Sequence, residues 1–289
     1  MKKFIIISIV TMLTASISLF AGGNSDTTKA ATKYPIILVH GISTNVDTIT
    51  SHLKVKEALE DKGAEVYRSW VDAFSGTFSK GEQFKAEVLR ILAISGAQKV
   101  HLIAHSNGVV YARYAVSNLG IRDKIASMTL LCGPNKGTSI ADIGMGLIPD
   151  ALEPAVSQVF RWLKPADVNG DFAQNGYDLT RPYMQNVFNP NTPDASGVYY
   201  QSWAVKIKYP KFNNILELSW AIILPFDGAN DGLIPEYSAK WTNFQTTITG
   251  SFWGSGIKHT DINSGEVTNS FDSSEFYVNI AIGLKDRNM

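Results

Sequence analysis

The 289-residue sequence contains a single cysteine, Cys132, and its charges balance at 26 basic against 26 acidic residues. One cysteine excludes an intramolecular disulfide and any metal site made of several thiolates. Its place in the apolar run 126–132 predicts a buried structural thiol. A net charge of zero gives no long-range attraction to nucleic acid or to an anionic membrane. The partner is therefore expected to bind in a pocket.

The start of the chain carries a long apolar run. Lys2 and Lys3 precede apolar residues 4–13, which Ser and Thr interrupt. This pattern predicts a signal peptide over residues 1–21 and a flexible segment over residues 22–32, rather than a membrane anchor. No cysteine follows the run, which excludes lipid attachment at a new N-terminal cysteine. We therefore expect an exported protein, either secreted or periplasmic.

The rest of the chain, residues 33–289, has the pattern of one α/β domain. Hydrophobic residues make up 45% of the sequence and charged residues 18%, as in globular proteins with a large core. Short runs rich in branched apolar residues alternate with stretches of helical spacing, which is typical of parallel strands joined by crossover helices. The expected strands are 34–39, 65–70, 99–104, 126–132 and 198–204, and the expected helices are 48–62, 79–94 and 107–119.

The alternation stops between the last two expected strands. Residues 139–197 are rich in Gly, Pro and Asn, and we interpret them as an insertion that forms a helical cap or lid. Within the insertion, residues 143–163 carry an apolar face. Such a face either covers a pocket or packs in the core, and the sequence leaves both readings open.

A candidate nucleophile lies in the string Ala104-His-Ser106-Asn-Gly108. The string falls between an expected strand and an expected helix, which is the context of the nucleophile elbow. Small residues two before and two after the serine let the strand and the helix approach each other closely. The alternative is a serine that caps an ordinary helix. The elbow predicts the α/β-hydrolase fold, a mostly parallel sheet flanked by helices.

A serine hydroxyl needs a base to take its proton and a carboxylate to orient that base. In this fold the chain order is serine, acid, histidine. His259 is the only histidine after Ser106, so it is the candidate base, against the alternative of an ordinary surface histidine.

The candidate acid is Asp231, in the turn string Ala229-Asn-Asp-Gly-Leu233. We interpret the apolar run 219–225 before it as a strand, because this fold carries its acid on a loop after a strand. Asp227 and Asp261 are the rivals, and each of the three also fits an ordinary turn.

Acyl chemistry also needs donors where negative charge develops, and removing one such donor costs about 3 to 4 kcal/mol. We expect two backbone N–H groups in this role. One belongs to Asn107, directly after the nucleophile, and the other to Ile42, in the loop after the first strand. The string His40-Gly41 at that strand end also fits an ordinary turn.

With these residues in hand, the chain resembles the bacterial true lipases of the Pseudomonas and Burkholderia type, which are secreted triacylglycerol lipases of the α/β-hydrolase superfamily. The segments that carry the resemblance are Tyr34 to Gly41, Val100 to Gly108, Asn230 to Ile234, and His259 to Asp261. The resemblance implies Ser106, Asp231 and His259 as a catalytic triad and the N–H groups of Ile42 and Asn107 as an oxyanion hole. It also implies a helical lid within residues 143–163.

We expect no cofactor for catalysis. The same resemblance implies a structural calcium ion that steadies the histidine loop. One family carboxylate lies two residues after the histidine and corresponds to Asp261. Glu217 is the best match for the second, although the family has an aspartate there, about 20 residues before the acid and so farther from it than Glu217 is. The alternative is that Asp261 is a turn residue and Glu217 a solvated one. Other departures are Ala104 in place of glycine, the missing disulfide, and Phe252, Trp253 and Gly254, which lengthen the segment between acid and base.

The leading functional hypothesis is hydrolysis of lipid esters through an acyl-enzyme. Alternatives with the same triad are a short-chain carboxylesterase, a phospholipase and an acyltransferase. A lipid-binding protein without activity is the alternative from another class, and the intact candidate triad argues against it. We expect a lipid or ester as partner and no nucleic acid; activation at a lipid–water interface and a dedicated folding chaperone are left open by the sequence.

Overall fold

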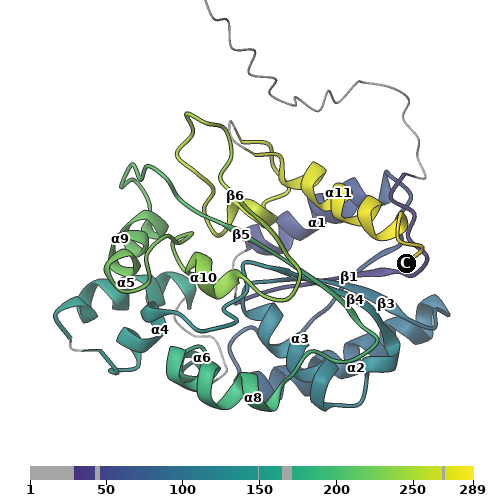
Figure 1. The fold of residues 1–289 in the computed structure, drawn as a ribbon, viewed down its shortest axis with the longest axis horizontal. Coiled ribbons are helices and arrows are strands. Elements are labelled where there is room, and N and C mark those ends of the chain that lie inside the picture. Colours follow the sequence, from purple (N-terminus) through teal and green to yellow (C-terminus); the bar gives the residue numbers. More distant parts are fainter. Residues whose placement is uncertain (1–28, 43–45, 149, 165–170, 269–270) are drawn as a thin grey trace, which may run out of the picture.

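The structure is a computed structural model that describes residues 29–42, 46–148, 150–164, 171–268 and 271–289 (Figure 1). The predicted signal peptide and most of the predicted flexible segment lie outside the described residues. Among the residues that are described, no helix combines the length and the apolar character needed to cross a membrane.

One six-stranded sheet forms the centre of the described molecule, with strand order β2-β1-β3-β4-β5-β6 and every neighbouring pair parallel. The strands are β1 (Ile36–Val39), β2 (Val66–Arg68), β3 (Val100–His105), β4 (Ile125–Leu131), β5 (Tyr199–Val205) and β6 (Phe244–Ile248). The residues of β1, β3 and β4 are buried throughout, as expected for strands covered on both faces. The predicted fold class is confirmed.

Helices cover both faces of the sheet (Figure 1). Helices α1 (Val46–Glu60) and α11 (Ser273–Lys285) lie on one face, and α2 (Thr77–Ser95) and α3 (Asn107–Asn118) lie on the other. Successive side chains of a strand point to opposite faces, so β1 contributes to both cores. Ile37 packs in the cluster beneath α2 and α3, whereas Ile36 packs in the cluster beneath α1 and α11.

The remaining helices lie mainly beyond the carboxyl ends of the strands (Figure 1). They are α4 (Ser139–Gly144), α5 (Glu153–Leu163), α6 (Phe172–Tyr177), α7 (Arg181–Tyr183), α8 (Asn189–Asn191), α9 (Ile215–Asp227) and α10 (Glu236–Ala239), with a π-helical turn at Met184–Phe188. Most of them fall in the predicted insertion. Only Val156 and Val159 of α5 are buried, and they pack in a core cluster with residues of α4 and α9, so α5 lies at the surface with one face on that cluster.

The prediction of a strand over residues 219–225 is wrong, because these residues belong to helix α9. Asn214 begins this helix, because its side chain accepts a hydrogen bond from the Glu217 N–H at 3.1 Å. The run is apolar at almost every position, and such a run does not distinguish a buried strand from a buried helix by periodicity.

Buried histidines make the folded state sensitive to acid. His101 is fully buried in β3, where its Nδ1 lies 2.7 Å from Ser127 Oγ, and burial lowers the pKa of His101 from 6.5 to about 4. Below pH 6.5 this histidine binds a proton in the unfolded chain but not in the folded chain. Its contribution to the free energy of unfolding is therefore fully present above pH 6.5 and is lost as the pH falls toward 4. Each unit of pKa is worth about 1.4 kcal/mol, so this residue contributes about 3 kcal/mol of acid sensitivity. We expect H101Q to flatten the slope of unfolding free energy between pH 6.5 and 4 in urea titrations; an unchanged slope would contradict this assignment.

Candidate active site

Ser106 lies at the sharp turn between β3 and α3. Its backbone has φ 57° and ψ −132°, a conformation that a non-glycine residue adopts only under strain. The neighbouring glycines allow this turn. A Cβ on Gly108 would lie 2.6 Å from the His40 carbonyl oxygen, and a Cβ on Gly41 would lie 2.7 Å from Ser106 Cβ. The expected strand, turn and helix around Ser106 are therefore present, with glycine where the segments touch.

The three residues of the predicted triad form one chain of hydrogen bonds. His259 Nε2 lies 2.8 Å from Ser106 Oγ, and His259 Nδ1 lies 2.7 Å from Asp231 Oδ2. A carboxylate only accepts hydrogen bonds, so Nδ1 is the donor and Nε2 is free to accept from the serine hydroxyl. This tautomer is the one that a general base needs.

The acid and the base are also held by the backbone. Asp231 Oδ1 accepts hydrogen bonds from the N–H groups of Leu233 at 2.9 Å and Ile234 at 2.7 Å. The His259 N–H donates to the Asp231 carbonyl oxygen at 2.9 Å. The carboxylate is therefore fixed in place before any substrate binds.

The two rival acids have other partners. Asp227 accepts hydrogen bonds from Arg181 at 2.8 Å, from the Ser139 N–H at 2.8 Å and from the Tyr237 hydroxyl at 3.1 Å. Asp261 accepts from the Lys258 N–H at 2.9 Å. The geometry thus singles out Asp231 as the partner of His259.

Two buried side chains pack against the candidate base, and the sequence did not predict either contact. His105 Nε2 donates to the His259 carbonyl oxygen at 3.1 Å, and the two rings lie 4.6 Å apart. Burial, followed by the neighbouring His259, lowers the pKa of His105 far below its usual value, so the ring is a neutral donor. Cys132 is buried as predicted, and its sulfur lies within 4.8 Å of ligand atoms of Asp231 and His259. Burial and the nearby Asp231 raise the pKa of the Cys132 thiol, which therefore keeps its proton.

Asn107, a predicted oxyanion donor, is the first residue of α3 and is anchored by its side chain. The buried ammonium of Lys80 hydrogen-bonds to Asn107 Oδ1, and Asn107 Nδ2 donates to Asn175 Oδ1 at 3.3 Å. Burial lowers the pKa of Lys80 to about 7. Lys80 was not predicted from the sequence, although it falls on the same face of its helix as Phe84 and Val88, at spacings of four residues.

The serine opens into a cavity of about 680 Å³. Gly41 and Ile42 line the cavity together with Ser106 and His259, so the second predicted oxyanion donor belongs to a residue at the site. The predicted cap contributes most of the apolar part of the wall, through Ile140, Phe160, Trp162, Leu163, Phe172 and Leu179. The cavity is therefore suited to an apolar group held next to a serine hydroxyl.

The predicted calcium carboxylates, Asp261 and Glu217, are close enough to interact electrostatically. Glu217 is among the groups that raise the pKa of Asp261, after burial of Asp261 itself. Glu217 is buried in α9 and accepts a hydrogen bond from the Asn213 N–H at 2.9 Å. Among the described residues, the only group of three or more acidic, cysteine or histidine ligands close enough for one ion is Cys132, Asp231 and His259, which does not include the predicted calcium pair.

Comparison with known families adds independent evidence on the fold. The family model described as alpha/beta hydrolase fold matches residues 34–225. The chain belongs to the alpha/beta hydrolase fold family. The matched segment contains Ser106 but ends before Asp231 and His259, so the placement of these two in this α/β hydrolase depends on the geometry above.

Curated relatives of this α/β hydrolase include bacterial triacylglycerol lipases. A Vibrio cholerae triacylglycerol lipase is 37% identical over 157 residues, which cover 52% of this chain and 48% of that protein. A Pseudomonas fragi triacylglycerol lipase is 35% identical over 130 residues, which cover 44% of this chain and 43% of that protein. The matched parts span less than half of either relative. At 35% to 37% identity over 44% to 52% of this chain, the resemblance to bacterial lipases is confirmed.

Solved structures agree on the fold. The mature form of a Bacillus licheniformis lipase superposes with a TM-score of 0.67 at 17% identity, covering 86% of this chain and 91% of that one. A metagenomic carboxyl esterase superposes with a TM-score of 0.65 at 16% identity, covering 88% and 76%.

Proposed function

We propose that the protein is an exported serine hydrolase that cleaves carboxylic esters of lipids through an acyl-enzyme intermediate. The observation that carries the proposal is the hydrogen-bonded chain Ser106–His259–Asp231, which opens into an apolar cavity. The lipase relatives favour a lipid ester over other acyl compounds. Export rests on the signal-peptide pattern of residues 1–21.

The proposed reaction has two halves. In the first half, His259 takes the proton of Ser106 while the serine oxygen attacks the ester carbonyl, and the imidazolium then protonates the leaving alcohol. In the second half, His259 takes a proton from water, which attacks the acyl-enzyme. The imidazolium then returns this proton to the Ser106 oxygen as the bond to the acyl group breaks and the fatty acid leaves. Asp231 stabilises the imidazolium in both halves and stays ionised.

We assign the developing oxyanion to the backbone N–H groups of Ile42 and Asn107. Asn107 opens helix α3, where unpaired N–H groups and the helix dipole favour negative charge. Lys80 and Asn175 hold the Asn107 side chain. The Asn107 donor is therefore fixed in position before substrate arrives, which is the condition for oxyanion stabilisation without reorganisation.

The acyl chain is assigned to the cavity beneath α4, α5 and α6. Its apolar wall predicts that longer acyl chains bind more tightly, since each buried methylene is worth about 0.8 kcal/mol in an apolar site. We propose α5 as a lid over this cavity, because it is a surface helix whose Phe160, Trp162 and Leu163 line the wall.

The test is turnover of p-nitrophenyl esters from acetate to palmitate by the processed protein. We expect kcat/KM to rise with chain length until the cavity is full. Activity confined to acetate and butyrate would reassign the protein as a short-chain esterase. No hydrolysis of any ester by the folded protein would contradict the proposal and favour lipid binding without catalysis.

We also propose a structural calcium ion between Asp261 and Glu217. Both are hard oxygen ligands, and a cation between them would relieve their repulsion, which adds to the larger effect of burial in raising the pKa of Asp261. The ion would join the histidine loop to helix α9 and would take no chemical part in catalysis. We expect calcium to raise the melting temperature of the wild-type protein and to leave that of D261N unchanged in scanning calorimetry. Equal shifts in the two proteins would place any calcium elsewhere.

A further inference from the structure

Four exposed aromatic side chains gather on two neighbouring loops. Tyr209 and Phe212 lie on the segment after β5 and are 66% and 62% exposed. Phe252 and Trp253 lie on the segment after β6 and are 78% and 89% exposed. Folded proteins seldom expose large apolar groups together without a partner for them. With Lys208 and Lys211, these residues form what we call the aromatic-lysine patch.

The two loops of the aromatic-lysine patch are bound to each other. The N–H groups of Lys208 and Tyr209 both donate to the Ser255 carbonyl oxygen, at 2.8 and 3.1 Å. Lys208 Nζ donates to the Ser251 carbonyl oxygen at 2.6 Å. The rings of Phe252 and Trp253 meet edge to face, 4.8 Å apart. The aromatic tip is therefore held in place by the segment that carries the lysines.

The local charge of the patch differs from that of the whole protein. Residues 206–213 and 249–258 contain four lysines and neither aspartate nor glutamate, although the chain has no net charge. Lys206 pairs with Glu236 at 3.1 Å, and Lys258 Nζ lies 3.9 Å from Asp261, so the lysines that carry the charge of the patch are Lys208 and Lys211. The surface therefore offers positive charge beside exposed aromatic rings. Lysines attract anionic lipid headgroups, and tryptophan and tyrosine favour the level of those headgroups.

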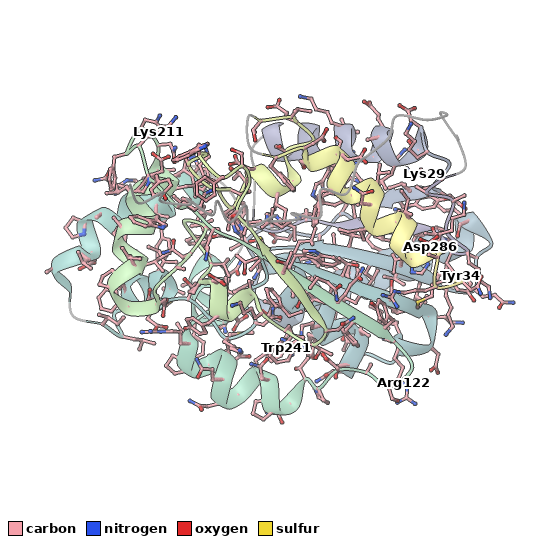
Figure 2. The ribbon with its side chains drawn as sticks, turned by 45° about the horizontal axis from the view of Figure 1, so that its top comes forward. Lys29, Tyr34, Arg122, Lys211, Trp241 and Asp286 are labelled. Atoms are coloured by element: carbon pink, nitrogen blue, oxygen red, sulfur yellow. The ribbon has the colours of Figure 1, made fainter. Side chains whose placement is uncertain are left out.

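The patch is joined to the histidine loop. The Ile257 N–H donates to the Lys206 carbonyl oxygen at 2.9 Å, and His259 follows two residues later. Figure 2 places Lys211 at the opposite end of the molecule from Tyr34, which precedes the first residue of β1. The patch thus lies toward the carboxyl ends of the strands, where Ser106 and the cavity also lie.

We propose that the aromatic-lysine patch docks the protein on a phospholipid surface that carries anionic headgroups. The aromatic rings enter the headgroup layer, and Lys208 and Lys211 pair with the phosphates. Docking there brings the active-site end of the protein to the lipid. This proposal rests on the proposed function, because a hydrolase of lipid esters has to reach an insoluble substrate.

The test is co-sedimentation of the processed S106A protein with vesicles of phosphatidylcholine, alone or mixed with phosphatidylglycerol. S106A is used because turnover would change the vesicles. We expect binding to the mixed vesicles, weakened about tenfold in F252S/W253S because two membrane-inserting rings are lost. The matched control is L89S/I94S, which removes two exposed apolar side chains from α2, and we expect it to bind like its parent.

The lysine contribution is tested with K211Q. We expect it to bind mixed vesicles about fivefold more weakly, the effect of one lysine near an anionic surface, and to bind pure phosphatidylcholine unchanged. K124Q, which removes an exposed lysine near the amino end of β4, is the control and should bind like its parent. A second readout is tryptophan emission. We expect the emission of S106A to shift to the blue on vesicles, and that of S106A/W253F, which lacks Trp253, to stay unchanged.

Three results would overturn the docking surface. They are full vesicle binding by F252S/W253S, equal loss in the two control variants, and a dimer in light scattering that F252S/W253S converts to a monomer. The last would identify a second copy of the chain as the occupant. Hydrolysis of soluble p-nitrophenyl acetate by the protein with Ser106 intact tests the catalytic proposal separately, so failure of one is distinguishable from failure of the other.

Discussion

Replacing Ser106 with alanine is expected to lower kcat for ester hydrolysis by about 10⁴-fold or more, because the nucleophile is then absent and only weak catalysis by the rest of the site remains. The cavity and the His259–Asp231 pair do not depend on the hydroxyl. KM for the residual reaction should therefore change little. The measurement is steady-state hydrolysis of a p-nitrophenyl ester.

Two controls show whether the loss of activity in S106A comes from the missing nucleophile or from a damaged fold. S106A should melt at or above the temperature of the wild type, since alanine removes a polar group from a strained turn without creating a clash. A serine outside the site, such as Ser274 at the start of α11, provides the matched variant S274A, which should keep full activity. S106A with wild-type turnover would remove Ser106 from the mechanism.

Asp231 to asparagine is expected to lower kcat by roughly 10⁴-fold, as when the acid of a serine, histidine and aspartate triad is neutralised. The asparagine oxygen can still accept the hydrogen bonds of Leu233 and Ile234. Its NH₂ group then faces His259 Nδ1 and favours the tautomer whose Nε2 carries the proton. The base cannot accept from Ser106 in that form, so the loss falls on kcat.

Asp227 to asparagine is the matched comparison, because Asp227 was a rival acid by sequence. Its carboxylate pairs with Arg181, so D227N should lower the melting temperature while kcat stays within a few-fold of wild type. Equal loss of kcat in D227N and D231N, measured on folded protein, would contradict the assignment of the acid.

Local sequence was sufficient where the chemistry demands a local shape. The strained turn at Ser106 needs small residues beside it, and Ala104 and Gly108 mark it in the sequence. His259 followed from chain order alone. Asp231 was selected for its turn string, although the strand expected before it is helix α9. The wrong element did not change the prediction of Asp231, because the turn, and not the preceding element, places its carboxylate beside His259.

Contacts between distant segments could not be predicted in this way. His105 meets His259 across 154 positions, and Lys80 meets Asn107 from another helix. Strand β6 was missed because its residues Phe244–Ile248 are only partly buried at the sheet edge and contain no continuous apolar run. The candidate reacting groups could be predicted from the sequence, whereas the side chains that pack around them could be found only from the fold.

The most direct test of the proposed mechanism is mass spectrometry of the wild-type protein after reaction with a p-nitrophenyl alkylphosphonate, a stable mimic of the tetrahedral intermediate. The predicted result is one alkylphosphonyl group per chain, on the peptide that contains Ser106, with loss of ester hydrolysis in proportion to labelling. Folded protein that stays unlabelled, or is labelled at another residue while hydrolysis is lost, would contradict the proposal that Ser106 carries the acyl group.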